Sequence, residues 1–198
     1  MDLKFISGLF FLYMIGSPCF AQSKKTVLKN KIKSITENVT INETGKLITY
    51  KESYILYNKQ GQVLEETSNN KEGSILKKET NKYANDKRKT EETFYQSKEA
   101  EENKQLESKN KKKTFKYNLN QDKTEEVEFD NNGKFIRKMK YAYNSEEEKT
   151  SETYYDVEGK LTKKVNYTYN NKSLKTKRES YRSDNSLESV KVYIYEFF

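Results

Sequence analysis

Short runs of alternating apolar and polar residues recur every 26 residues over 115–195. In the clearest run, 161–169, one Leu, one Val and two Tyr residues fall on alternate positions, with Thr, Lys and Asn between them. A period of two is typical of a β-strand that covers one face better than the other. The pattern therefore predicts strands throughout this part of the chain.

Two kinds of turn separate the predicted strands. Residues 156–159 read Asp-Val-Glu-Gly, in which Asp can bond its own backbone two residues on and Gly accepts the positive φ of a tight turn. A second turn is expected at 170–173, so one unit holds two strands and two turns. Because a single hairpin is marginally stable, stacked units predict an all-β fold: an antiparallel meander of β-hairpin repeats in one extended twisted sheet.

One set of aromatic residues marks the repeat. Successive members are 26 residues apart, except for a step of 34 between the second and third: Tyr57, Tyr83, Tyr117, Tyr143, Tyr169 and Tyr195. Three turn glycines follow such a tyrosine by sixteen residues: Gly73, Gly133 and Gly159. We expect this set to be structural, with contacts between units worth roughly 0.2–1 kcal/mol each.

A second aromatic set lies two residues before the first: Phe115, Tyr141, Tyr167 and Tyr193. Rows of exposed Tyr residues can bind sugars or protein partners, so this set is a candidate binding strip. The alternative is a half-buried spine that only holds the sheet. A further row of acids follows the repeat tyrosines by nine residues, and we expect it on a solvated face paired with Lys and Arg: Glu66, Glu92, Glu126 and Glu152.

The N-terminus predicts export. Residues 1–21 combine one Lys near the start, an apolar run at 5–15 and a small residue, Ala21, at the end, which is typical of a secretory signal peptide. The only cysteine, Cys19, is expected to leave with it; a lipid anchor at Cys19 is the less favoured alternative, because Pro18 does not fit the small residues that precede a lipidated Cys. We therefore expect a periplasmic, outer-membrane-associated or secreted protein.

The remaining chain divides into two parts. A lead-in segment at 22–46 is expected to contain one or two strands, and 47–198 is expected to form the hairpin-repeat sheet. The step of 34 places eight extra residues in a charged loop near 96–109, either a long solvated hairpin loop or a short helical excursion. No segment after the signal peptide is apolar enough to span a membrane.

Composition narrows the function classes. The 198 residues are 34% charged and 33% hydrophobic, which is too polar for a thick core, yet disorder would not keep Tyr in fixed register. The chain has no His and only one Cys, which argues against Ser-His-Asp and Cys-His nucleophiles and against His/Cys metal sites. We expect neither an enzyme nor a cofactor. The net charge of +8 indicates an acidic partner, and we expect an envelope polymer, lipid head groups or an unknown protein.

Nucleic acid is a weaker alternative partner. The run 109–116 is Lys-rich and leads into aromatic residues, which is a pattern of single-strand binders. Because acids are mixed through every unit and the chain carries an export signal, we do not expect nucleic acid to be bound.

The repeat also resembles a known family. Residues 155–161, Tyr-Asp-Val-Glu-Gly-Lys-Leu, and 129–135, Phe-Asp-Asn-Asn-Gly-Lys-Phe, are each followed by Tyr-x-Tyr-Asn and resemble the tyrosine-aspartate (YD) repeats of RHS-type proteins. The resemblance covers about 47–198 and is greatest to the short exported repeat proteins common in Bacteroidota. We predict an exported noncatalytic repeat protein with a binding or structural role at the cell envelope. Alternatives are a carbohydrate- or anionic-polymer-binding module using the Tyr strip, and an immunity or effector-associated repeat protein.

Overall fold

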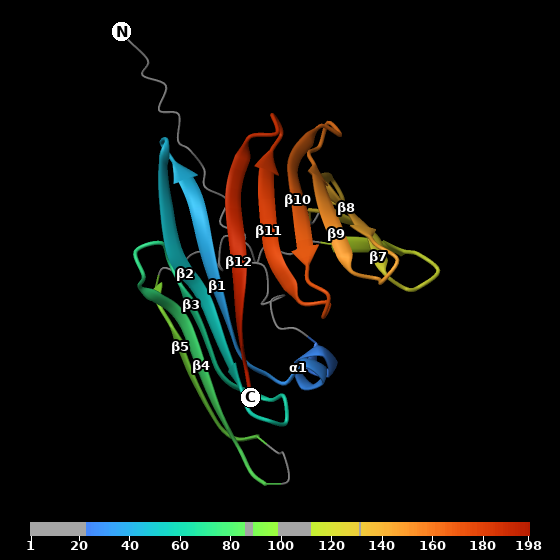
Figure 1. Cartoon of the computed structure of the whole chain (residues 1–198). Helices are drawn as coiled ribbons and strands as arrows, with labels where there is room; N and C mark the ends of the chain where they lie inside the picture. Colours follow the sequence, from blue (N-terminus) through green and yellow to red (C-terminus); the bar gives the residue numbers. More distant parts are fainter. Residues whose placement is uncertain (1–22, 86–88, 99–111, 131) are drawn as a thin grey trace.

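The computed structural model describes residues 23–85, 89–98, 112–130 and 132–198. The predicted signal peptide with Cys19, and nearly all of the charged loop near 96–109, lie outside these residues. The described chain begins with one short helix, α1 (Lys24–Asn30), and continues as strands (Figure 1). The strands are β1 (Ile32–Glu43), β2 (Lys46–Tyr57), β3 (Val63–Asn69), β4 (Ile75–Tyr83), β5 (Lys89–Gln96), β6 (Lys112–Tyr117), β7 (Lys123–Phe129), β8 (Phe135–Tyr143), β9 (Lys149–Tyr155), β10 (Leu161–Tyr169), β11 (Lys175–Arg182) and β12 (Leu187–Phe197).

All twelve strands form one antiparallel sheet, in the order β5-β4-β3-β2-β1-β12-β11-β10-β9-β8-β7-β6. The predicted all-β meander of hairpins is therefore confirmed. The strand order differs from a simple meander at one place, because β1 pairs with β12, with Ile35 opposite Tyr195. As a result β5 and β6, which follow each other in the chain, are the two edges of the sheet and do not form the hairpin expected across 96–109.

The 26-residue unit is visible in the strand bounds. Strands β7, β9 and β11 begin at Lys123, Lys149 and Lys175, one repeat apart. In the turn between β9 and β10, the Asp156 carboxylate accepts hydrogen bonds from the backbone N–H groups of Glu158 and Lys160, both at 2.9 Å. The expected glycine conformation is also present in the equivalent turns, with φ of +84° at Gly73, +78° at Gly133 and +77° at Gly159.

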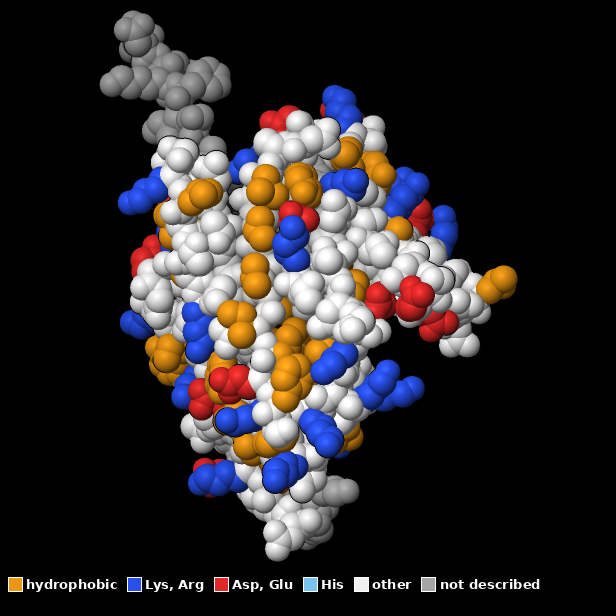
Figure 2. Space-filling view, in the orientation of Figure 1, with side chains coloured by type: hydrophobic (Ala, Val, Ile, Leu, Met, Phe, Trp, Pro, Cys, Tyr) orange, Lys and Arg blue, Asp and Glu red, His pale blue; other side chains and the backbone are white. Residues whose placement is uncertain are grey.

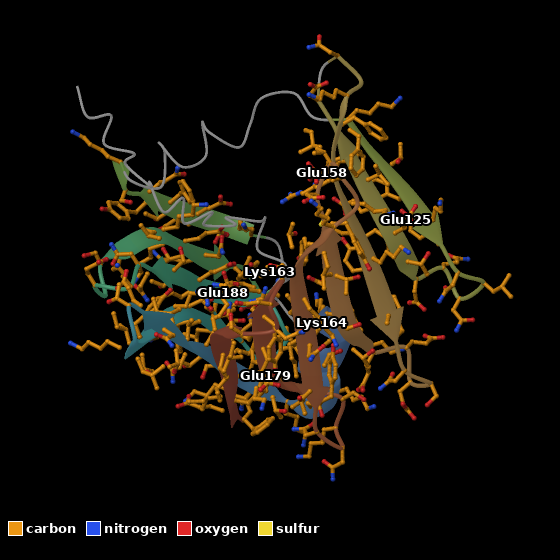
Figure 3. The ribbon with its side chains drawn as sticks, turned by 90° about the horizontal axis from the view of Figure 1, so that it is seen from above. Glu125, Glu158, Lys163, Lys164, Glu179 and Glu188 are labelled. Carbon is orange, nitrogen blue, oxygen red and sulfur yellow. The ribbon has the colours of Figure 1, made fainter. Side chains whose placement is uncertain are left out.

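The sheet curls into a trough, which is seen end-on in Figure 3. Lys163 and Glu188, which pair at 2.6 Å, lie between its two arms (Figure 3). Because side chains alternate along β10, Val165 and Tyr167 share the concave face with Lys163. The concave face is the inner side of the trough, on which these residues lie.

Apolar packing is concentrated at one end of the trough, where α1 lies near the C-terminus (Figure 1). The buried cluster joins the helix to both halves of the sheet: Val27, Ile32, Ile35, Ile55, Tyr57, Leu174 and Tyr193. On the opposite, convex face, hydrophobic side chains remain exposed among lysines and acids (Figure 2). In β12, Leu187, Val192 and Ile194 are exposed. The apolar cluster of this single-layer sheet therefore lies at the end that α1 covers.

Candidate functional site

Most of the repeat tyrosines that we expected to be structural form hydrogen bonds between neighbouring strands. In four hairpins the Tyr hydroxyl donates a hydrogen bond of 2.8–3.0 Å to the carbonyl oxygen of the residue 20 positions earlier: Tyr83 to Val63, Tyr143 to Lys123, Tyr169 to Lys149 and Tyr195 to Lys175. Burial, with Glu148 and Glu152 nearby, raises the pKa of the Tyr169 hydroxyl to about 12. These tyrosine side chains therefore stabilise the sheet through hydrogen bonds to its backbone.

Two tyrosines of this set, Tyr57 and Tyr117, differ from the other four in their surroundings in the sheet. Tyr117 lies on the edge strand β6 and is exposed, because β5 is not beside it to supply the carbonyl. Tyr57 is buried in the apolar cluster near Glu37 and Glu66, and burial raises the pKa of its hydroxyl to about 12. The position of a repeat tyrosine in the sheet therefore determines whether its hydroxyl bonds to the carbonyl oxygen of a neighbouring strand.

The candidate binding strip lies on the concave face and is not uniformly exposed. Phe115 on the edge is 45% exposed, Tyr141 and Tyr167 are half-buried, and Tyr193 is only 7% exposed. The four residues therefore do not form the open aromatic platform that the sequence allowed.

Lysine ammonium groups fill the spaces between these rings. Three lysines, themselves 26 residues apart, each lie 4.8–5.5 Å from the centroids of two consecutive rings: Lys123 between Phe115 and Tyr141, Lys149 between Tyr141 and Tyr167, and Lys175 between Tyr167 and Tyr193. A cation over an aromatic face within about 6 Å is attracted by the ring quadrupole. We call this arrangement the lysine–aromatic ladder.

Sequence reasoning missed the lysines of the ladder. Each follows a repeat tyrosine by six residues, so the spacing was visible in the sequence. Their role was not, because a Lys at the start of a strand is usually solvated, and only the curl of the sheet brings it between two rings.

The acidic row lies partly in the interior, contrary to the solvated face that was expected. Glu126 and Glu152 are buried on the concave face. The Lys149 ammonium lies 2.5 Å from the Glu152 carboxylate, which also accepts a 2.6 Å hydrogen bond from the Tyr154 hydroxyl. Burial opposes ionisation, but Lys149 outweighs it and holds the pKa of Glu152 below its ordinary value. The expected position was wrong because the curl turns this face inward.

A buried ion pair lies where the two halves of the sheet meet. Lys191 on β12 pairs with Glu37 on β1 at 3.1 Å and with Glu52 on β2. Burial raises the pKa of Glu37 above its ordinary value, although Lys191 counteracts the effect. This pair joins the N-terminal and C-terminal halves through side chains as well as through the strand ladder.

A hollow in the described surface lies at the α1 end of the trough. It holds about 380 Å³ and is lined by residues of α1, β1, the β2–β3 turn and the C-terminus: Val27, Leu28, Lys31, Ile32, Asn58, Lys59, Gly61 and Phe198. We call it the α1 pocket. Gly61 has φ +68°, and a Cβ there would come within 3.0 Å of the Leu28 side chain, so the turn requires Gly to let α1 approach.

The α1 pocket is lined by apolar side chains and by two lysines, Lys31 and Lys59. Val27 and Ile32 are buried in its floor, whereas Leu28 and Phe198 are 45% and 47% exposed. The Lys59 ammonium lies 6.0 Å from the centroid of the Phe198 ring. The backbone N–H of Phe198 donates to the carbonyl of Lys31 at 2.9 Å and fixes the chain end beside the helix.

Within the described ranges, no three His, Cys, Asp or Glu side chains are grouped so that they could hold a metal ion. In the same part of the chain, no helix has the length and apolar character needed to cross a membrane.

Comparisons with known proteins give only remote likenesses. No protein-family model and no curated protein matches the chain. Among solved structures, a DUF1329 family protein from Desulfovibrio piger is 13% identical, with 86% of this chain and 87% of that chain covered and a TM-score of 0.41. A LolA superfamily protein from Nitrosomonas europaea is 10% identical, with 89% and 92% covered and a TM-score of 0.32.

A third structure, TcdB2-TccC3-Cdc42, is 8% identical, with 77% of this chain and 10% of that chain covered and a TM-score of 0.20. At these identities and TM-scores the likenesses carry no argument about function. The repeated β-hairpin is established by the strand order, whereas membership of the YD/RHS family stays a prediction.

Proposed function

We propose that this protein is a noncatalytic binding protein of the cell envelope whose ligand is an anionic amphiphile held in the α1 pocket. The observation that carries the proposal is a hollow with an apolar floor and two lysines at its rim. Export rests on the predicted signal peptide at 1–21, and an anionic ligand fits the net charge of +8.

The apolar part of the ligand would contact Leu28 and Phe198. Both side chains are about half exposed in the free protein, so a bound hydrocarbon chain would remove their apolar surface from water, at about 25 cal/mol per Å². A volume of about 380 Å³ lies within the range of small-molecule pockets, which begins at about 300 Å³. A short acyl chain or part of a longer one fits this space.

The anionic part would lie beside Lys31 and Lys59. Both line the α1 pocket, and an ammonium on a flexible stem can follow a carboxylate or phosphate at the mouth. The lysine–aromatic ladder offers no comparable site, because its ammonium groups already lie between rings. The carbohydrate alternative depended on an open Tyr strip and is therefore not favoured.

A matched pair of variants tests the apolar contact. Phe197 and Phe198 are neighbours with 46% and 47% exposure, but only Phe198 lines the α1 pocket. Binding of a fluorescent fatty acid, followed by its emission, should weaken about 5–30-fold in Phe198→Ala, which corresponds to about 1–2 kcal/mol of lost apolar burial. The same change at Phe197 should leave binding within about twofold of the native protein. Equal effects, or no binding by the native protein, would refute the proposal.

A second pair of variants tests whether the lysines of the α1 pocket bind the anionic group of the ligand. Lys59→Gln should weaken binding of the fatty acid a few-fold and reduce its salt dependence, because one ammonium at the mouth is lost. Lys172, which lies 5.3 Å from the Phe197 ring and outside the α1 pocket, supplies the control variant Lys172→Gln. A fatty alcohol of the same length should bind the native protein and Lys59→Gln equally. A loss for the alcohol as large as for the acid would contradict the anionic assignment.

A further inference from the structure

Two strands of the sheet have only one neighbour each. β5 pairs with β4, β6 pairs with β7, and no other pairing of these two strands occurs among the described residues. Residues 89–95 of β5 and all of β6 are exposed, including the aromatic side chains of Phe94, Tyr95 and Tyr117. Unpaired N–H and C=O groups on such edges are ready to bind another strand.

The repeat indicates which residues of the two edge strands would lie opposite each other. Four hairpins place opposite each other two residues that are 13 positions apart: Glu66 and Glu79, Glu126 and Met139, Glu152 and Val165, and Arg178 and Lys191. By the 26-residue step, the equivalents on β5 and β6 are Glu92 and Lys113. They are 21 positions apart because of the eight extra residues, and in the sheet they lie on opposite edges.

Charge also favours this pairing. β5 carries Glu91 and Glu92 against one Lys, whereas β6 carries Lys112, Lys113 and Lys116 and no acid. Pairing β5 with β5 would set Glu near Glu, and pairing β6 with β6 would set Lys near Lys, both of which are unfavourable across strands. The strand that complements each edge in register and in charge is the other edge.

We propose that two copies of this chain bind each other edge to edge, β5 of each against β6 of the other, with Glu92 opposite Lys113. The arrangement has twofold symmetry and is closed, so it removes both free edges of both sheets at once. In such a dimer β1 and β12 continue to join the two halves of each copy, as they do in the single chain. The interface is independent of the α1 pocket.

Disulfide trapping tests the pairing directly. The full chain with Cys19→Ser has no other cysteine, so Glu92→Cys and Lys113→Cys can be introduced into separate chains. When the two single variants are mixed and oxidised, we expect a dimer linked between positions 92 and 113, identified on a non-reducing gel and by peptide mass. Each variant oxidised alone should stay monomeric on the gel. The full chain in sedimentation should show about twice its own mass of 23.5 kDa.

The remaining outcomes overturn the proposal. A disulfide that forms only within one chain, when both cysteines are on the same molecule, would mean that the sheet closes on itself. Absence of any 92–113 bond would exclude this register. Glu126→Cys with Met139→Cys is the control, since these residues are opposite each other in the β7–β8 hairpin and should form a bond within one chain. Circular dichroism of each variant confirms that the sheet is retained.

Discussion

Replacing Lys149 by Met should destabilise the protein far more than the loss of an ordinary surface lysine. The Lys149 ammonium lies 5.4 Å from the Tyr141 centroid and 5.2 Å from the Tyr167 centroid. It is also 2.5 Å from the carboxylate of Glu152, which is buried. Methionine keeps most of the apolar stem but removes the charge.

Two contributions set the expected magnitude. Loss of two partly buried cation–π contacts costs roughly 1–2 kcal/mol. Leaving the Glu152 carboxylate buried without its cation costs about 2 kcal/mol more, because the hydrogen bond from Tyr154 remains and lessens the penalty. The free energy of unfolding should therefore fall by roughly 3–4 kcal/mol in Lys149→Met.

Urea unfolding followed by circular dichroism measures this loss. The matched control is Lys160→Met, because Lys160 pairs with Glu158 in an exposed turn and the change should leave the unfolding midpoint almost unaltered. Adding Glu152→Gln to Lys149→Met should restore part of the stability, since the unpaired charge is removed. If Lys149→Met and Lys160→Met unfold at the same urea concentration, the ladder does not stabilise the sheet and the reasoning fails.

Three further perturbations test other parts of the account. Tyr169→Phe should lower the free energy of unfolding by about 1 kcal/mol through the lost hydroxyl-to-carbonyl hydrogen bond, whereas Tyr117→Phe on the edge should not change it. Gly61→Ala should cost more than Gly133→Ala, because both have positive φ but only Gly61 lies against α1; thermal melting compares them. Burial opposes ionisation of the Glu126 carboxyl, but Lys123 and Lys113 outweigh it and hold its pKa below the ordinary value of 4.5, so its contribution to stability should be complete above pH 4.5 and be lost as the pH falls further. Urea midpoints measured against pH should show this loss in the native protein and less of it in Glu126→Gln.

The repeating strands and turns could be predicted because their determinants are local. Alternation over 161–169 and the Asp-to-Gly turn at 156–159 act within a few residues, and the structure has β10 and the turn at those places. The pairing of β1 with β12 could not be predicted in this way. Ile35 and Tyr195 meet across almost the whole chain, and no feature of either strand alone selects the other as its neighbour.

The face of the sheet on which each side chain lies was predicted less well than the positions of the strands. Period two shows that Tyr167 and Tyr169 share one face, but it does not say whether that face is concave. Curl depends on the twist of all twelve strands together, and it puts Tyr193 and Glu152 in the interior. The α1 pocket was missed for a related reason, since it combines Leu28, the turn at Gly61 and the C-terminal Phe198, which are distant in sequence.

The most direct test of the account is the reactivity of individual tyrosines toward nitration in the folded chain, read out by peptide mass spectrometry. Exposed Tyr95 and Tyr117 should react first, Tyr141 and Tyr167 slowly, and Tyr57 and Tyr193 only after unfolding. This order would support an interior ladder of aromatic rings and lysines. Rapid and equal reaction of Tyr141, Tyr167 and Tyr193 would mean that these rings form an open strip, and would contradict the central claim that the lysine–aromatic ladder covers these rings on the concave face.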